Sequence, residues 1–185
     1  MKSNWTKAAS ILVLGGLLAA GPAFADTRQP DPASPAQTDS RLENEVRHKL
    51  RMLPYYGVFD NLEFKVSGDH VELYGQVTWP TLKSDAEHAV KEIRGVETVA
   101  NNIKVLPLSP MDDHIRLAVY RAVFSKGGLF RDALGANPSI HIIVENGNVT
   151  LVGVVANQGD SILANIAANG VPGVFSVTNR LRIES

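Results

Sequence analysis

Residues 71–105 read VELYGQVTWPTLKSDAEHAVKEIRGVETVANNIKV, and residues 149–183 read VTLVGVVANQGDSILANIAANGVPGVFSVTNRLRI. A shift of 78 positions aligns the two segments without a gap, and ten of the 35 pairs are identical. The identical pairs are Val71/Val149, Leu73/Leu151, Gly75/Gly153, Val77/Val155, Ala86/Ala164, Ala89/Ala167, Gly95/Gly173, Val96/Val174, Val99/Val177 and Asn101/Asn179. They first alternate, as in a strand, and then recur at helical spacing. The sequence therefore predicts one fold written twice.

Each copy is predicted to follow the order helix, strand, strand, helix, strand. A capping box at Ser40–Glu43 indicates the start of the first helix, and Ser109-Pro110 indicates the start of its counterpart. Two strands follow, with turns at Gly68-Asp69 and Asn146-Gly147. The predicted fold class is α+β, with two tandem αββαβ domains at 40–107 and 108–185. Each domain has a three-stranded mixed sheet with two helices on one face.

The N-terminal segment has the features of an export signal. Lys2 and Lys7 precede an apolar run over residues 8–20, and Ala23-Phe24-Ala25 provides small residues for signal peptidase. We expect residues 1–25 to be a signal peptide cleaved after Ala25, which predicts a periplasmic protein. Residues 26–39 are rich in proline and lack large aliphatic side chains, so they are predicted to form a disordered tether.

Composition argues against several classes of function. The chain has 18 Lys and Arg against 19 Asp and Glu, and 6% aromatic residues, which disfavours nucleic-acid binding. The absence of cysteine excludes disulfides, thiolate metal sites and lipid anchors on cysteine. The five histidines lack close ligand spacing and fall at predicted surface or turn positions, so no metal, cofactor or catalytic group is expected. Asn101 and Asn179 are expected to bond nearby backbone rather than a ligand.

The repeated motif resembles the BON domain family. Both copies contain V-x-L-x-G-x-V, a helix with A-x-x-A, and G-V-x-x-V-x-N-x-[IL]-x-[VI]. The resemblance implies a non-catalytic periplasmic or envelope protein, often induced by osmotic or other stress, that binds phospholipid or contacts other envelope proteins. Two-domain outer-membrane relatives carry a lipidated cysteine. This chain has none, which favours peripheral over anchored membrane association.

Function is expected where the two copies differ. In the second helix, Ser84, Asp85 and His88 are replaced by Ile162, Leu163 and Ile166, and Glu97 is replaced by Phe175, near Val171 and Val174. An exposed apolar patch of this kind predicts a binding surface. Burial of the patch between the domains or in a homo-oligomer is the alternative. The outer sheet face of the second domain also becomes apolar, at Ile143, Val152 and Val154, and the first domain is expected to cover one of the two faces.

The predicted ligand is an anionic phospholipid surface. Ile162, Leu163, Ile166, Val171 and Phe175 would enter the acyl boundary, and Arg180 and Arg182 would meet the headgroups. A second candidate is the loop containing Lys126, Leu129, Phe130 and Arg131, unless Leu129 and Phe130 cap the core. The competing hypothesis is a protein-interaction or stress-protection module that presents the same patch to an envelope protein.

Overall fold

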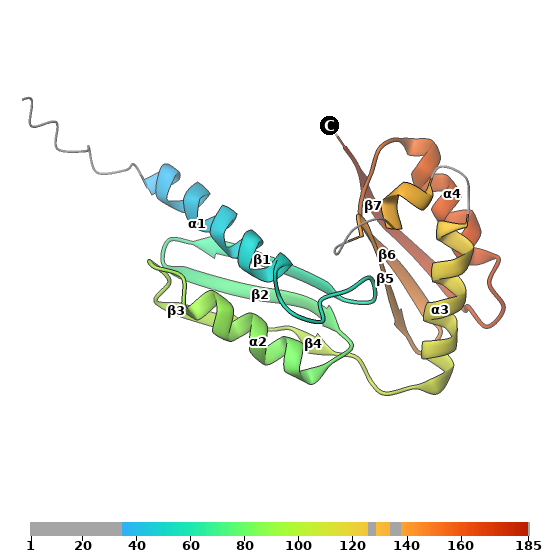
Figure 1. The fold of residues 1–185 in the computed structure, drawn as a ribbon, viewed down its shortest axis with the longest axis horizontal. Coiled ribbons are helices and arrows are strands. Elements are labelled where there is room, and N and C mark those ends of the chain that lie inside the picture. Colours follow the sequence, from blue (N-terminus) through green and yellow to red (C-terminus); the bar gives the residue numbers. More distant parts are fainter. Residues whose placement is uncertain (1–34, 126–128, 134–137, 185) are drawn as a thin grey trace, which may run out of the picture. The chain divides into compact units, whose positions relative to one another are not determined.

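The computed structural model describes residues 35–125, 129–133 and 138–184, and these ranges form two repeats of one mixed α and β unit (Figure 1). The first repeat contains α1 (Pro35–Arg51), β1 (Asn61–Ser67), β2 (His70–Val77), α2 (Pro80–Lys91), β3 (Thr98–Asn101) and β4 (Lys104–Val105). The second contains α3 (Pro110–Phe124), the short 3₁₀ helix η1 (Leu129–Ala133), β5 (Ile140–Glu145), β6 (Asn148–Val155), α4 (Gln158–Asn169) and β7 (Ser176–Ile183). The predicted fold class is confirmed.

The second strand of each hairpin is the central strand of its sheet. β2 pairs antiparallel with β1 and parallel with β3 and β4, and β6 pairs antiparallel with β5 and parallel with β7. The registers of the two sheets match: Val71 lies opposite Val99, as Val149 lies opposite Val177. A parallel third strand needs a crossover, and α2 and α4 provide it.

Both helices of a repeat pack against one face of its sheet. In the first repeat, Leu42 and Val46 of α1 share a core with Leu82 and Val90 of α2 and with Leu73 of β2. In the second, the helices contribute Ile115, Val119, Val123, Ala164 and Ala168, and the strands contribute Ile142, Val149 and Leu151. Figure 1 shows α3 and α4 beside each other against the second sheet. The apolar periodicity of the sequence therefore identified the core face of each helix.

The start of α1 differs from the prediction. The helix begins at Pro35, five residues before the expected cap at Ser40, so residues 35–39 of the predicted tether are helical. Proline is favoured at the first position of a helix, and the alanine and glutamine that follow are good helix formers. The other helix start was predicted correctly, because Ser109 Oγ accepts a hydrogen bond from Asp112 N (3.2 Å). The rest of the predicted tether and the predicted signal peptide lie outside the described residues.

The repeated glycine of the central strand has one structural role in both copies. Gly75 and Gly153 have φ angles of +110° and +126°. A Cβ atom at Gly75 would lie 2.0 Å from Asn61 O, and a Cβ atom at Gly153 would lie 2.0 Å from Ser139 O. Only glycine permits both the backbone conformation and this close approach of the neighbouring strand.

We therefore predict that Gly153→Ala lowers the free energy of unfolding by about 3 kcal/mol or more, because the added methyl group displaces backbone. Gly68→Ala is the matched control, since Gly68 also has a positive φ but a Cβ there would meet nothing within 4 Å. It should cost about 1 kcal/mol. Urea unfolding measures both, and equal losses would refute the role of the close approach.

Candidate functional site

The exposed face of α4 is the apolar surface that the sequence predicts. Asn157 caps the helix by accepting a hydrogen bond from Asp160 N (2.9 Å), while Ala164 and Ala168 face the core. Ile162 and Ile166 lie one turn apart on the other side and are 49% and 62% exposed. Leu163 is half-buried and packs against the core. The α4 face is therefore open to contact at Ile162 and Ile166.

Of the two remaining predicted patch residues, both in the turn after α4, one is exposed and the other is buried. Phe175 is 84% exposed, and its backbone N donates to Gly147 O (2.9 Å). Its ring lies against the backbone of the β5–β6 turn, where a Cβ at Gly147 would be 2.4 Å from Phe175 Cδ2. Val171 is buried in the core, and its predicted role in surface contact is wrong. We use "the α4 patch" for Ile162, Ile166 and Phe175.

The described residues of the second candidate loop differ in their burial and in their contacts. Leu129 is fully buried in the core, so its alternative role as a core cap is confirmed. Phe130 is 62% exposed and does not cap the core. Arg131 Nη2 lies 2.5 Å from Asp160 Oδ2, which places this arginine beside the start of α4. Lys126 lies outside the described residues.

Arg180 and Arg182 do not lie on the same face of the sheet as α4. Asn179 Nδ2 donates to Ser161 O (3.1 Å) and Ser161 Oγ (2.9 Å), so the Asn179 side chain points toward α4. Successive side chains of a strand point to opposite faces. Arg180 and Arg182 therefore extend from the outer face, and their predicted partnership with the α4 patch is wrong because of this alternation.

The repeated asparagines have the structural role that was expected. Asn101 Nδ2 donates to Lys83 O (2.9 Å) and Glu87 Oε2 (3.0 Å), and Asn101 Oδ1 accepts from Ile103 N (3.2 Å). Asn179 Oδ1 likewise accepts from Leu181 N (3.1 Å). Hydrogen bonds from Lys91 and then from Asn101 lower the pKa of the Glu87 carboxyl. Both asparagines therefore connect the last strand to the crossover helix.

Part of the outer face of the second sheet is covered, as expected. Ile143 and Val152 are buried together with Leu106, which follows β4 of the first repeat. Val154 is half-buried. Lys104 of β4 also pairs with Glu145 of β5 (Nζ to Oε1, 2.6 Å). The first repeat therefore covers apolar residues of the outer sheet face, while the α4 patch stays exposed.

The predicted surface position of His141 is wrong. His141 is buried on β5, stacks on Tyr56 with ring centroids 5.3 Å apart, and its Nδ1 lies 3.1 Å from Gly57 O. A carbonyl can only accept, so Nδ1 carries the proton. Ile142 N donates to Val58 O (2.7 Å) beside it. Burial lowers the pKa of His141 and raises the pKa of Tyr56 to about 12. The alternating pattern of the β5 residues does not indicate that a loop distant in the sequence covers this edge of the sheet.

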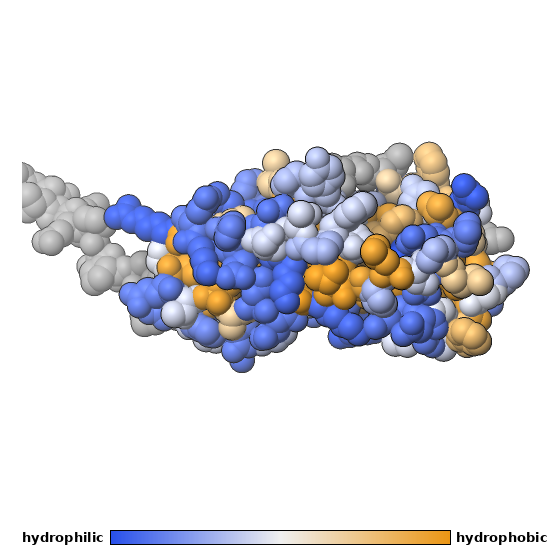
Figure 2. All heavy atoms as spheres, turned by 90° about the horizontal axis from the view of Figure 1, so that it is seen from below, coloured by the Kyte–Doolittle hydropathy of each residue, from blue (hydrophilic) through white to orange (hydrophobic). Residues whose placement is uncertain are grey.

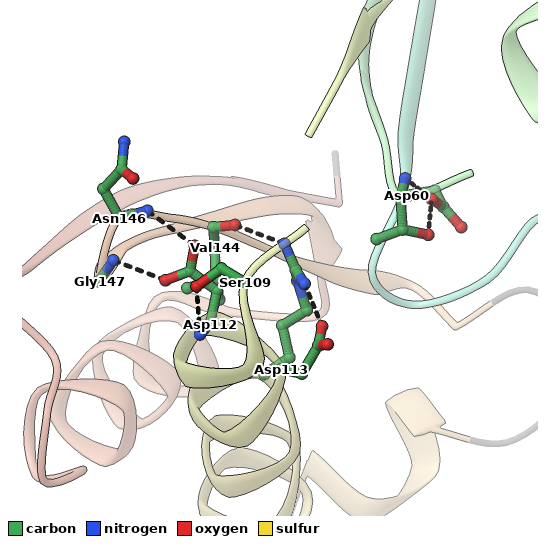
Figure 3. A network of polar contacts seen from close by, with 9 residues as sticks. Asp60, Ser109, Asp112, Asp113, Val144, Asn146 and Gly147 are labelled. Carbon is green, nitrogen blue, oxygen red and sulfur yellow. Dashed lines mark hydrogen bonds and ion pairs between the residues drawn. The ribbon is translucent and has the colours of Figure 1, made fainter. Parts of the chain in front are cut away.

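Buried carboxylates that the sequence analysis missed hold two turns in place (Figure 3). Asp60 Oδ1 accepts from Thr78 N (2.7 Å), and Asp60 Oδ2 accepts from Gly57 N (3.1 Å). Asp112 accepts from Asn146 N (2.9 Å) and Gly147 N (2.8 Å), which fixes the β5–β6 turn. Buried Arg116 donates to Val144 O (2.8 Å) and pairs with Asp113. The signal in the sequence was that these residues stand beside a helix start or a strand. Their side chains form hydrogen bonds with backbone groups and so hold the backbone in place.

The described residues offer neither a metal centre nor a membrane span. In these ranges, no group of three or more His, Asp or Glu side chains is arranged to hold a metal ion. Within the same ranges, no helix has the length and apolar character needed to cross a bilayer. On the surface shown in Figure 2, apolar side chains gather in patches among hydrophilic ones.

The model of the BON domain matches residues 38–107 and 126–185, and the chain belongs to this family. The two matches correspond to the two structural repeats, although the second begins after α3. BON proteins are generally non-catalytic and associated with the cell envelope. No curated protein matches the sequence.

Two of the solved structures that match the chain show its low sequence identity to them. One is the C-terminal domain of CdsD, described as the structural protein of the type III secretion system of Chlamydia trachomatis, with 13% identity and a TM-score of 0.32. The match covers 78% of this chain and 98% of that one. A second structure of CdsD, from the same organism, has 13% identity and a TM-score of 0.31, and the match covers 78% and 92% of the two chains.

The buried histidine predicts a pH dependence of stability. Because the pKa of His141 is lowered in the folded protein, the unfolded chain binds the proton first as pH falls below about 6.5. The free energy of unfolding should then fall by up to about 1.4 kcal/mol per pH unit until the folded pKa is reached. Unfolding by urea between about pH 7.5 and about pH 5.5 measures this loss.

His141→Gln should reduce the loss of stability, because glutamine keeps an N–H donor for Gly57 O but does not titrate. His88→Gln, at an exposed position on α2, is the control and should keep the wild-type dependence. The same pH dependence in wild type and His141→Gln would show that another group is responsible.

Proposed function

We propose that this protein is a non-catalytic periplasmic protein that binds anionic phospholipid surfaces peripherally through the α4 patch. The observation that carries the proposal is the exposure of Ile162, Ile166 and Phe175. Two of these residues lie on one helix face and the third lies in the turn that follows the helix. A helix face of this kind can enter the boundary between headgroups and acyl chains.

The charge of α4 supports an apolar contact. Asp160 is the only charged residue of the helix, and it pairs with Arg131. The equivalent helix of the first repeat, α2, carries Lys83, Asp85, Glu87 and Lys91. The desolvation of unpaired charges would oppose membrane insertion of α2, whereas α4 avoids this cost. The second repeat is therefore the proposed membrane-binding unit.

The headgroup contact is proposed for Arg131. Among the described cations predicted to meet headgroups, Arg131 is the one that an ion pair places beside α4. Its partner Asp160 offsets its charge, and Arg180 and Arg182 extend from the other face of the sheet. We expect apolar insertion to supply most of the binding energy, with a modest preference for anionic lipid.

Co-sedimentation with vesicles tests the proposal. Ile166→Asp with Phe175→Asp should weaken binding to phosphatidylglycerol vesicles by about 100-fold, because each removed side chain would lose at least about 1.5 kcal/mol of burial. Leu108→Asp is the matched control, since Leu108 is a 94% exposed apolar residue outside the patch. It should bind like the wild type. Circular dichroism and urea unfolding establish that the variants are folded.

The alternative is that the α4 patch binds another envelope protein. If the wild-type protein binds neither anionic nor phosphatidylcholine vesicles, the lipid proposal is refuted and this alternative is favoured. Binding to vesicles that survives the double substitution would move the contact away from the α4 patch.

Export makes a separate prediction. If residues 1–25 form a signal peptide, the protein recovered from the periplasm should begin at Asp26, and intact-mass measurement would detect the loss of the preceding residues. Ala25→Leu should slow processing, because signal peptidase requires a small side chain at this position. A periplasmic protein that retains residues 1–25 would refute cleavage.

A further inference from the structure

A positively lined groove lies on the outer sheet side of the second repeat, away from α4. It has a volume of about 620 Å³ and is lined from α1, β1, β6 and β7. Its charged lining residues are Arg47, Lys65, Arg180 and Arg182, with Glu43 and Glu63. The positive excess is notable because the whole chain has a formal charge of −1. Positive charge is therefore concentrated at this groove.

Most of these cations are available to a ligand. Lys65, Arg180 and Arg182 are exposed, and none of them pairs with a described carboxylate. Arg47 lies over the Phe64 ring, 5.6 Å from its centroid. Glu63 accepts a hydrogen bond from Asn61 Nδ2 (2.8 Å). Arginine can bind a carboxylate or phosphate group through two parallel hydrogen bonds. The groove is thus suited to anionic groups.

An adjoining hollow offers a different kind of contact. It has a volume of about 280 Å³, and Arg180 lines both spaces. Gln76, Asn146 and Thr150 also line it, and their side chains have no hydrogen-bond partner among the described residues. Figure 3 shows the Asn146 side chain directed away from Asp112, which is bonded to the Asn146 backbone. Free amide and hydroxyl groups can donate to and accept from sugar hydroxyls.

We propose that the groove and the adjoining hollow together bind an acidic oligosaccharide. The guanidinium groups of Arg180 and Arg182 would contact its carboxylate or phosphate groups, and Gln76 and Thr150 would contact its hydroxyls. Leu62, Phe64 and Val66 are half-buried and supply apolar lining for the C–H faces of the sugar rings. Because Arg180 joins the two spaces, the ligand spans more than one sugar. This site is independent of the proposed membrane contact.

Isothermal titration of the exported protein with hexagalacturonate tests the proposal. The wild type should bind this probe more tightly than neutral maltohexaose, and salt should weaken the binding. Arg180→Ala with Arg182→Ala should weaken it at least about tenfold. Arg94→Ala with Arg121→Ala removes the same charge at exposed positions outside the groove and should have little effect. Failure of the wild type to bind hexagalacturonate would overturn the proposal.

A second variant separates sugar recognition from charge attraction. Gln76→Leu with Thr150→Val keeps the approximate shapes but removes hydrogen-bonding groups. It should weaken binding of hexagalacturonate and leave binding of inorganic polyphosphate unchanged. If it alters neither, and polyphosphate binds as tightly as the sugar, the groove is a general anion surface and the proposal is wrong.

The two proposals can be refuted separately, because each predicts a different effect of the two double substitutions. Arg180→Ala with Arg182→Ala should keep wild-type binding to phosphatidylglycerol vesicles, and Ile166→Asp with Phe175→Asp should keep wild-type binding to hexagalacturonate. Loss of vesicle binding in the arginine variant, without loss of sugar binding, would assign these cations to the membrane and overturn the sugar site.

Discussion

The Asn179 side chain connects β7 to α4 through its amide nitrogen, while its carbonyl oxygen accepts from Leu181 N. Asn101 makes the equivalent contacts between β3 and α2 in the first repeat. These hydrogen bonds fix which face of the last strand meets the helix. Since strand side chains alternate, the same contact also fixes which residues point away from the helix. Each repeat therefore has a core face, on which this asparagine and the apolar strand residues lie, and an outer face.

That alternation separates two kinds of surface on the second repeat. Ile162 and Ile166 project from α4 on the helical side, whereas Arg180 and Arg182 extend from the opposite side of the sheet. The apolar residues of α4 and the arginines of β7 therefore cannot both face one flat membrane surface. In the two proposals, the α4 patch therefore binds by apolar contact, and the cationic groove takes a ligand of its own.

The sequence predicted features that depend on periodicity within one repeat. The core faces of the helices, the hairpin turns and the role of Asn101 and Asn179 follow from spacing alone. Features that depend on contacts between distant segments were missed. The burial of His141 requires the loop containing Tyr56 and Gly57 to lie along β5, and no local pattern indicates this contact. The prediction for Arg180 and Arg182 was wrong because these residues lie near the patch in the sequence, whereas strand alternation directs their side chains to the opposite face of the sheet.

The two repeats share the residues that the fold requires and differ at residues that are available for function. Gly153 and Asn179 recur because backbone approach and helix attachment require them in both copies. Ile162 and Ile166 correspond to Ser84 and His88, which are exposed at the same places in the first repeat. The fold therefore does not require isoleucine at either position. Exposed apolar side chains without a folding role reduce solubility unless they meet a partner, so their presence on α4 argues for a contact outside the chain.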